Sequence, residues 1–330
     1  MGRGTILVTG GAGYVGSHVV LKLRERGESV VVLDDLSRGF RQSVGEAPLV
    51  VGDVGDRQLV AGLLREHGVD TVLHFAAFTI APESVRDPLG YYANNVCGTR
   101  NLLQCCAESK VRHFVFSSSA AVYGTPAGDL AAEDSPTVPI NPYGTSKLVS
   151  EWMLRDLASA SDLRYVALRY FNVAGSDTGG RIGQATPGAT LLIKVASEAS
   201  VGKRTHVSIF GTDYPTPDGT GIRDYIHVED LAGAHLAALD YLRRAGASTV
   251  LNCGYGHGYS VREVLESVQR VSGRRLTTRE EPRRAGDPAV LVAKADRIRT
   301  VLGWTPRLDD LDTIVRTSLD WEARQLREPW

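Results

Sequence analysis

Tyr143 and Lys147 lie four residues apart, a spacing that places two side chains on one face of a helix, a turn apart. An ammonium group beside a phenol favours the phenolate, so Lys147 is expected to lower the pKa of Tyr143 from about 10 towards neutrality. Tyr143 is then a candidate acid and base for a substrate hydroxyl. The spacing alone is weak evidence, because long helices carry such pairs by chance and a solvated pair is the commoner case. The surrounding elements decide between the two interpretations.

A serine-rich segment precedes the pair by one element. Val111–Phe116 has the composition of a buried strand, and Ser117–Gly124 follows it. Ser119 would lie at the carboxyl end of this strand, where its hydroxyl could bind a substrate oxygen; the alternative is a turn serine that satisfies its own backbone. Asn141–Pro142 predicts an extended segment before a helix over Tyr143–Leu157. A serine at a strand end, followed by Tyr and Lys, is a rarer combination than either part.

A glycine-rich turn near the N-terminus has the pattern of a dinucleotide-binding motif. It lies between an expected strand over Thr5–Thr9 and an expected helix over Ser17–Arg26. Gly10 permits the tight turn, Gly13 lets the backbone approach a pyrophosphate, and Gly16 lets the helix pack on the strand. The helix then points free N–H groups and the positive end of its dipole at the phosphates.

Two carboxylates and a pair of alanines extend this motif. The second strand, Ser29–Leu33, is followed by Asp34, at the position where a carboxylate accepts hydrogen bonds from the adenosine ribose and repels a 2′-phosphate. The pattern therefore favours NAD over NADP. Asp53 could accept from the adenine amine, with an ordinary turn residue as an equally good interpretation. Ala76 and Ala77, at the end of another strand, leave room for a flat ligand.

Strands continue to alternate with helices, which predicts an α/β fold with a doubly wound, parallel sheet of Rossmann type. We expect residues 1–175 to form an NAD-binding domain to which roughly 222–255 return, and 176–330 to form mainly a smaller, mixed α/β lobe that binds the substrate. Further elements are expected over Leu49–Val51, Arg57–His67, Thr71–Phe75, Tyr91–Ser109, Leu163–Arg169 and Leu191–Val201.

Composition excludes several classes of function. The formal net charge of −1 gives no general attraction to nucleic acid or to an anionic membrane, and no apolar run is long enough to span a bilayer. The four cysteines and eight histidines have neither metal-ligand spacing nor a disulfide framework. We therefore expect a cytoplasmic protein without a metal, a membrane segment or a nucleic-acid partner.

The second half carries arginines in turn-rich segments. Arg223 lies within the loop-rich stretch Ile209–Val228, and Arg284 and Asp287 lie in Arg283–Asp287. Two arginines suit capture of a diphosphate, and a carboxylate suits a ribose or sugar hydroxyl. Surface arginines in ordinary loops are the alternative.

With these residues in view, the chain resembles the extended short-chain dehydrogenase/reductases and, among them, the UDP-glucose (UDP-galactose) 4-epimerases. The resemblance runs nearly end to end. Its most specific stretches are Val8–His18, Asn94–Thr99, Phe116–Gly124, Tyr143–Leu148, Leu168–Asn172 and Ile209–Asp230.

The resemblance implies roles for individual residues. Tyr143 is similar to the catalytic base, Lys147 to the residue that lowers its pKa and holds the nicotinamide ribose, and Ser119 to the serine that positions the hydroxyl. The implied cofactor-binding residues, for NAD, are Gly10, Gly13, Tyr14, Val15, Gly16, Asp34, Asp53, Val54, Phe75, Ala76, Ala77, Asn94, Lys147, Tyr170 and Phe171. The implied residues for a UDP-sugar are Ser119, Tyr143, Asn172, Phe210, Arg223, Arg284, Asp287 and Leu291.

The implied reaction is reversible epimerisation at C4 of a UDP-hexose through a transient 4-keto sugar. Two departures from the family pattern affect the substrate. Thr190 stands where some members have an asparagine, which puts one amide contact to the nucleotide in doubt. Leu291 stands at the position that limits sugar size; it is smaller than tyrosine and larger than serine or cysteine. UDP-glucose and UDP-galactose are expected as the main pair, with N-acetylated sugars slow.

Related activities remain as alternatives. Dehydratases and decarboxylases of this fold carry a carboxylate just after the strand-end serine, and Ala120–Ala121 stand there instead. A 4-epimerase of UDP-N-acetylglucosamine, UDP-glucuronate or UDP-xylose differs only in the sugar pocket. A non-catalytic NAD-binding regulator need not keep Ser119, Tyr143 and Lys147 together. By resemblance, Asn95–Ser109 and Tyr143–Leu157 would pair with a second copy to form a homodimer.

Overall fold

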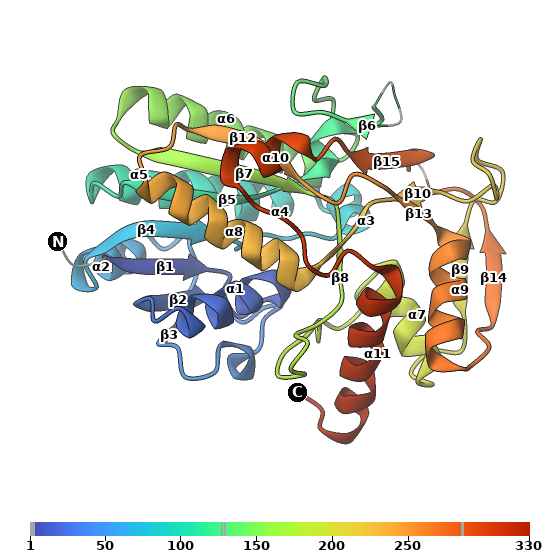
Figure 1. Ribbon diagram of the computed structural model, residues 1–330. Helices are drawn as coiled ribbons and strands as arrows, with labels where there is room; N and C mark the ends of the chain where they lie inside the picture. The colour runs from blue at the N-terminus through green and yellow to red at the C-terminus, as the bar shows by residue number, and fades with distance from the viewer. Residues whose placement is uncertain (1–3, 127, 129, 285–286) are drawn as a thin grey trace.

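Runs rich in Val, Ile and Leu pair as one seven-stranded parallel sheet at the centre of the computed structural model, which describes residues 4–126, 128, 130–284 and 287–330 (Figure 1). The strand order is β12-β7-β5-β4-β1-β2-β3. Strand order therefore reverses between β1 and β4, and ligands of such sheets bind at the carboxyl ends of the strands beside this point. The strands are β1 (Thr5–Thr9), β2 (Val30–Asp34), β3 (Leu49–Val51), β4 (Val69–His74), β5 (His113–Ser119), β7 (Arg164–Tyr170) and β12 (Thr249–Cys253).

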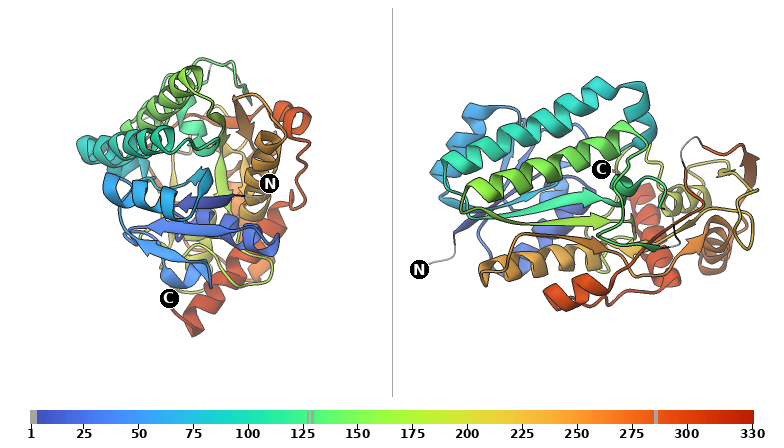
Figure 2. Two further views of the ribbon diagram at one scale, coloured as in Figure 1. Left: turned by 90° about the vertical axis from the view of Figure 1, so that its left-hand side faces the viewer. Right: turned by 90° about the horizontal axis from the view of Figure 1, so that it is seen from above.

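Helices cover both faces of this sheet, which confirms the doubly wound Rossmann-type fold (Figure 2). Ile6 and Val8 of β1 belong to the core that includes α1 (Tyr14–Glu25) and α8 (Val228–Arg243). Leu7 belongs to the core on the other face, with side chains of α2 (Arg57–Glu66), α5 (Gly98–Glu108) and α6 (Pro142–Ala160). Alternate residues of a strand point to opposite faces, so a strand buried on both faces is apolar throughout.

The prediction of one long helix over Tyr91–Ser109 is wrong in detail. The segment contains the end of α4 (Pro88–Tyr91), a π-helical segment η2 (Tyr92–Cys97) and α5. A π-helical insertion changes which side chains face the sheet, and such insertions are frequent at functional sites. Helix α1 also begins three residues earlier than expected, at Tyr14 directly after Gly13.

The C-terminal part adds a smaller lobe at the carboxyl end of the central sheet (Figure 1). Its largest sheet has the order β13-β10-β15-β6, and β14 pairs with β9. Segment β11 pairs with β8 beside the central sheet. The elements not yet given are η1 (Arg41–Val44), α3 (Ala81–Arg86), η3 (Ala120–Tyr123), β6 (Leu130–Ala131), β8 (Asn172–Ala174), α7 (Leu192–Ser200), β9 (Val207–Phe210), β10 (Ile222–Arg223), β11 (Tyr225–His227), β13 (Tyr259–Ser260), α9 (Val261–Ser272), β14 (Thr278–Glu281), β15 (Val290–Ala293), α10 (Asp296–Leu302) and α11 (Leu311–Arg327). Among the described helices, none is both long and apolar enough to cross a membrane.

Four buried histidines make the fold sensitive to acid. Burial lowers the pKa of His18, His227 and His235 to about 4 and that of His74 to about 3. The unfolded chain binds protons at these positions below pH 6.5 while the folded chain does not, so their contribution to stability is complete above pH 6.5 and is lost as the pH falls towards 4.

We expect the free energy of unfolding, measured in urea, to fall between pH 6.5 and 4.5, by up to about 1.4 kcal/mol per pH unit for each such histidine. His235 is the position to vary, because its Nε2 is buried without a hydrogen-bond partner among the described residues. Replacement by leucine should flatten the slope, whereas the same change at the exposed His67 should leave it unaltered. Equal slopes in the two variants would contradict this account.

Candidate active site

Helix α6 places Tyr143 and Lys147 against the carboxyl end of β5. The side chain of Asn141 caps the helix by accepting a hydrogen bond from the Gly144 backbone N–H at 2.9 Å, and Pro142 occupies its first turn. Tyr143 is 8% exposed and Lys147 3% exposed. Both side chains therefore lie on the buried side of α6, as their four-residue spacing predicts.

Lys147 faces the end of β5 directly. Its Nζ donates a hydrogen bond to the carbonyl oxygen of Ser117 at 2.8 Å and lies 5.0 Å from the centre of the Phe116 ring. Burial lowers the pKa of Lys147 to about 7, and the Glu151 carboxylate acts in the opposite direction. The charge of this amine therefore depends on its neighbours.

The pKa of Tyr143 moves against the expectation from the sequence. Burial raises the pKa of the phenol, the Tyr170 phenol adds to the rise, and a hydrogen bond with Ser119 opposes it. The expected lowering by Lys147 is wrong for the protein alone, because the phenol is enclosed and the Lys147 amine is directed at the Ser117 carbonyl. The site has to gain positive charge before Tyr143 becomes a phenolate.

Ser119 ends β5 and begins η3. Its hydroxyl accepts a hydrogen bond from the Ala121 backbone N–H at 3.1 Å, as the turn-serine alternative requires, and also contacts Tyr143. The neighbouring Ser117 donates from its Oγ to the Tyr170 hydroxyl at 2.9 Å. The end of β5 thus connects both tyrosines of the site.

A buried ion pair lies behind these residues. Glu151, one turn after Lys147, accepts hydrogen bonds from Arg169 at 2.6 and 2.9 Å and from the Ser118 hydroxyl at 2.5 Å. The side chains of Glu151 and Arg169 are 4% and 7% exposed. The pair therefore joins α6 and β7 to Ser118 of β5.

The glycine turn forms a groove beside this site. Gly10 has a φ of +69°, and a Cβ there would lie 2.4 Å from the Ala76 backbone nitrogen. A Cβ on Gly16 would lie 2.2 Å from the Gly10 carbonyl oxygen, so the close packing of α1 on β1 requires glycine. Gly13 lines the groove, and the N-terminus of α1 opens onto it. This cradle fits a dinucleotide diphosphate.

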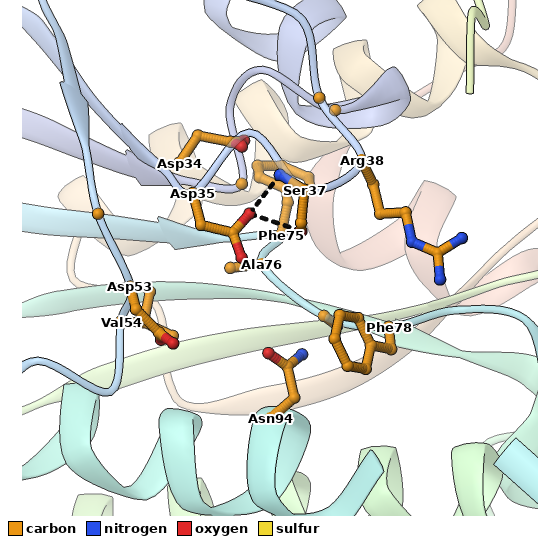
Figure 3. Close-up of a pocket in the computed structure, with 15 residues that line it drawn as sticks. Asp34, Asp35, Ser37, Arg38, Asp53, Val54, Phe75, Ala76, Phe78 and Asn94 are labelled. Atoms are coloured by element: carbon orange, nitrogen blue, oxygen red, sulfur yellow. Dashed lines mark hydrogen bonds between the residues drawn. The ribbon is translucent and has the colours of Figure 1, made fainter. Parts of the chain in front are cut away.

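Carboxylates lie at the far end of the groove, as Figure 3 shows. Asp34 ends β2 and accepts hydrogen bonds from the backbone N–H groups of Ala12 and Leu36, both at 2.9 Å. Asp34 therefore lies at the end of a strand, the position from which a carboxylate binds the adenosine ribose in such folds. Asp53 lines the same groove while also accepting from the Gly55 backbone N–H at 2.7 Å, which is the turn role considered for it.

All cofactor residues expected from the sequence, except Lys147, line this groove or the cavity that adjoins it. The groove is lined by Gly10, Gly13, Asp34, Asp53, Val54, Phe75, Ala76, Ala77 and Asn94. The adjoining cavity, of about 410 Å³, is lined by Tyr14, Val15, Gly16, Tyr170 and Phe171. Lys147 lies behind it, against β5.

Six of the expected substrate residues meet in the larger cavity: Ser119, Tyr143, Asn172, Arg223, Asp287 and Leu291. Arg223 and Leu291 are register partners in the parallel pair β10–β15, so the smaller sheet places them side by side. A cavity of this size, with few polar groups at defined places, is typical of a small-molecule site.

Phe210 and Arg284 do not line this cavity. The Arg284 guanidinium lies over the Phe210 ring, 3.7 Å from its centre, and Arg283 pairs with Asp213. Ala285 and Gly286, in the same expected segment, lie outside the described residues. The structure therefore brings these two expected nucleotide contacts to each other, outside the residues that line the cavity.

Several lining residues were not expected from the sequence. Arg38 and Phe78 line both cavities, and Gln184 and Thr186 line the larger one. Thr190, which stands where some members of the family have an asparagine, lines the larger cavity too. Arg38 could have been predicted as a lining residue, because it lies just past Asp34 in the loop after the second strand, and this loop faces the adenosine in such folds. The loop over 184–189 has no periodicity, so the sequence did not indicate that Gln184 and Thr186 line the cavity.

Comparison with known proteins gives consistent matches. The model of the NAD dependent epimerase/dehydratase family matches residues 6–254. A UDP-glucose 4-epimerase of Azospirillum brasilense is 56% identical over 318 residues, covering 96% of this chain and 91% of the relative. The crystal structure of UDP-glucose 4-epimerase from Brucella ovis in complex with NAD is 43% identical, with a TM-score of 0.93, and the match covers 96% of this chain and 98% of that one. The corresponding structure from Bifidobacterium longum, in complex with NAD⁺ and UDP, is 38% identical, with a TM-score of 0.92 and coverage of 98% and 99%.

Proposed function

This chain belongs to the NAD dependent epimerase/dehydratase family, and we propose the residues around Tyr143 as the catalytic site of its reaction. The reaction is the reversible epimerisation at C4 of a UDP-hexose, UDP-glucose or UDP-galactose, with NAD as the cofactor. One observation carries the assignment of residues: Ser119 and Tyr143 line a cavity that adjoins the dinucleotide groove and that also contains Arg223 and Leu291.

The proposed roles follow from where each group lies. Tyr143 takes the proton of the 4-hydroxyl, and Ser119, hydrogen-bonded to Tyr143, orients that hydroxyl. NAD, held by the residues of the groove, would supply the acceptor and donor for the hydride at C4, and a positive charge near Tyr143 would favour its phenolate form. Lys147, whose amine donates to the Ser117 carbonyl in this structure, would hold a ribose hydroxyl of the cofactor and would add positive charge to the site when protonated. Tyr143 finally returns the proton to the epimerised sugar.

Inversion also requires the sugar to turn over while the nucleotide stays in place. Arg223 and Asp287 line the cavity on the side of the smaller lobe, and we assign them to the diphosphate and to a ribose or sugar hydroxyl. Asn172 lies between them and Tyr143 in the chain and lines the same cavity. Phe210 and Arg284, stacked on each other beside the cavity, remain proposed contacts to the nucleotide. The 4-keto sugar can then rotate about its bond to the diphosphate.

Ala120 and Ala121 separate this reaction from dehydration. Both line the cavity directly after Ser119. Expulsion of water from C6 needs an additional acid and base beside the sugar, and two methyl side chains cannot supply them.

A panel of UDP-sugars tests the proposal. Purified protein with retained NAD should interconvert UDP-glucose and UDP-galactose, and absorbance at the reduced nicotinamide band should rise transiently when either sugar is added. Absence of both signals, with NAD retained, would refute the assignment of this cavity to the sugar.

Leu291 is predicted to limit sugar size. Replacement by serine should raise the ratio of kcat/KM for UDP-N-acetylglucosamine to that for UDP-glucose by roughly tenfold, the effect of a few methyl-sized groups in a pocket. Replacement by tyrosine should lower it. Val290, its neighbour on β15, is absent from the residues that line the cavity and serves as the matched position: Val290→Ser should leave the ratio unchanged. Comparable turnover of both sugars by the original protein would show that Leu291 does not gate the pocket.

We also propose that the chain forms a homodimer through the outer faces of α5 and α6. Trp152 is 46% exposed on α6, and Val85 and Leu89, on helices that pack against α6, are 63% and 77% exposed. Exposed apolar side chains on helices that pack together are consistent with a protein partner at this part of the molecule. Sedimentation of the protein and of Trp152→Glu measures the assembly directly.

The division at residue 175 and the cytoplasmic location stay predictions. Limited proteolysis checks the first, and cell fractionation checks the second.

A further inference from the structure

The loop after β2 is tied to helix α3 by an ion pair. Nη2 of Arg38 lies 2.8 and 3.0 Å from the two carboxylate oxygens of Glu83, and the guanidinium lies 5.9 Å from the centre of the Phe78 ring. The two partners come from segments that are 45 residues apart in the chain. Arg38 is 41% exposed and Glu83 33% exposed, so the pair sits at the surface of the molecule, where it can open and close.

The segment on the Glu83 side of this contact is joined to α4 and η2 by hydrogen bonds. The hydroxyl of the buried Tyr91 lies 3.1 Å from a Glu83 carboxylate oxygen and accepts a hydrogen bond from the Ile80 backbone N–H at 3.0 Å. Asn95 holds the backbone of Phe78 from both sides, since its side chain accepts from the Phe78 N–H at 2.8 Å and donates to its carbonyl at 3.0 Å. The loop that carries Arg38 therefore contacts a segment, Phe78–Glu83, that is itself hydrogen-bonded to its neighbours.

Arg38 lies where the two cavities meet. Both are lined by Gly10, Gly13, Arg38, Phe75, Ala77 and Phe78. Arg38 is the one charged side chain among these shared, described residues. Since Gly10 and Gly13 form the phosphate cradle, a dinucleotide that spans both cavities passes its diphosphate beneath the guanidinium. Figure 3 shows Arg38 reaching from its loop towards Phe78, opposite Asp53 and Asn94.

We propose that Arg38 and Glu83 form a clasp that retains the bound dinucleotide by closing over its diphosphate. The inference rests on the assignment of the groove to NAD. The guanidinium offers positive charge to the diphosphate, and the ion pair keeps the loop closed, so release requires the pair to separate. Retention matters to this reaction because the hydride removed from the sugar has to be returned by the same cofactor molecule.

Exchange of bound NAD against an excess of deuterium-labelled NAD, followed by mass spectrometry of the holoenzyme, measures release directly. Glu83→Gln keeps the shape of the side chain and removes its charge, and it should accelerate exchange about fivefold, as expected for a well-formed but partly exposed ion pair. Arg38→Ala also removes charge from the diphosphate and should accelerate exchange about tenfold. Exchange from the original protein should quicken with added salt, and that from Glu83→Gln should respond less.

Arg41 provides the matched control, because it is exposed, lies three residues on, and has no ion-pair partner among the described residues. Arg41→Ala should exchange at the original rate. Slower exchange in Glu83→Gln would overturn the clasp, since it would mean that Glu83 withholds the guanidinium from the phosphates. Unchanged exchange in Glu83→Gln would overturn it too, whatever Arg38→Ala does. A purified protein that retains no NAD at all would overturn the assignment of the groove together with the clasp.

Discussion

Tyr143→Phe is expected to lower kcat for interconversion of UDP-glucose and UDP-galactose by roughly 100- to 10,000-fold, the contribution of a positioned acid and base. The change deletes one hydroxyl from a side chain that is 8% exposed, and it leaves the ring that fills the space between β5 and the cavity. Directly around Tyr143, Ser119 is engaged with the Ala121 backbone N–H, and Ala120 and Ala121 are apolar, so these neighbours offer no equivalent acid and base.

The same variant separates catalysis from folding. Its NAD content and its urea unfolding midpoint should equal those of the original protein, because the phenol donates to no buried carboxylate. Tyr165→Phe, on the β7 strand and outside the cavity, is the matched control and should retain full activity. Substantial epimerase activity in Tyr143→Phe would show that another group moves the proton.

Glu151→Leu is expected to lower the free energy of unfolding by about 3–5 kcal/mol, because it leaves the buried Arg169 guanidinium without its counter-charge. The loss of the contact with Ser118 adds to this effect. Urea unfolding of the purified variant measures it. The exposed pair Arg155–Asp156 on the same helix is the matched comparison, and Asp156→Leu should cost less than about 1 kcal/mol.

A second replacement identifies the cause. Changing Arg169 to methionine in the Glu151→Leu background should recover most of the lost stability, since a buried pair replaced by apolar groups leaves no isolated charge. A double variant as unstable as the single one would mean that Glu151 acts through the packing of α6 rather than through its charge.

Local patterns were sufficient for much of the site. The glycine turn, the position of Asp34 and the spacing of Tyr143 and Lys147 depend on residues close in sequence, and the structure places each on the expected element. Their roles in catalysis and binding remain proposals. The strand-end position of Ser119 could be predicted for the same reason, since a buried apolar run has a definite end.

Properties that depend on packing could not be predicted. The direction of the Tyr143 pKa depends on burial by elements as distant as β7, and a four-residue spacing carries no information about burial. The Arg38–Glu83 contact requires the loop after β2 to meet helix α3, and the position of Arg284 over Phe210 requires two segments of the smaller lobe to meet. Such contacts are decided by the arrangement of whole elements.

The late position of β12 in the chain has a consequence for biosynthesis. This strand covers the open side of β7, and helix α8 just before it packs against α1 and over the apolar face of β5 and β7. A nascent polypeptide that has emerged from the ribosome as far as Tyr170 therefore still exposes the unpaired edge of β7 and an uncovered apolar face of the sheet. Chaperone binding should persist until translation has passed Cys253, because an uncovered strand edge readily joins strands of other chains.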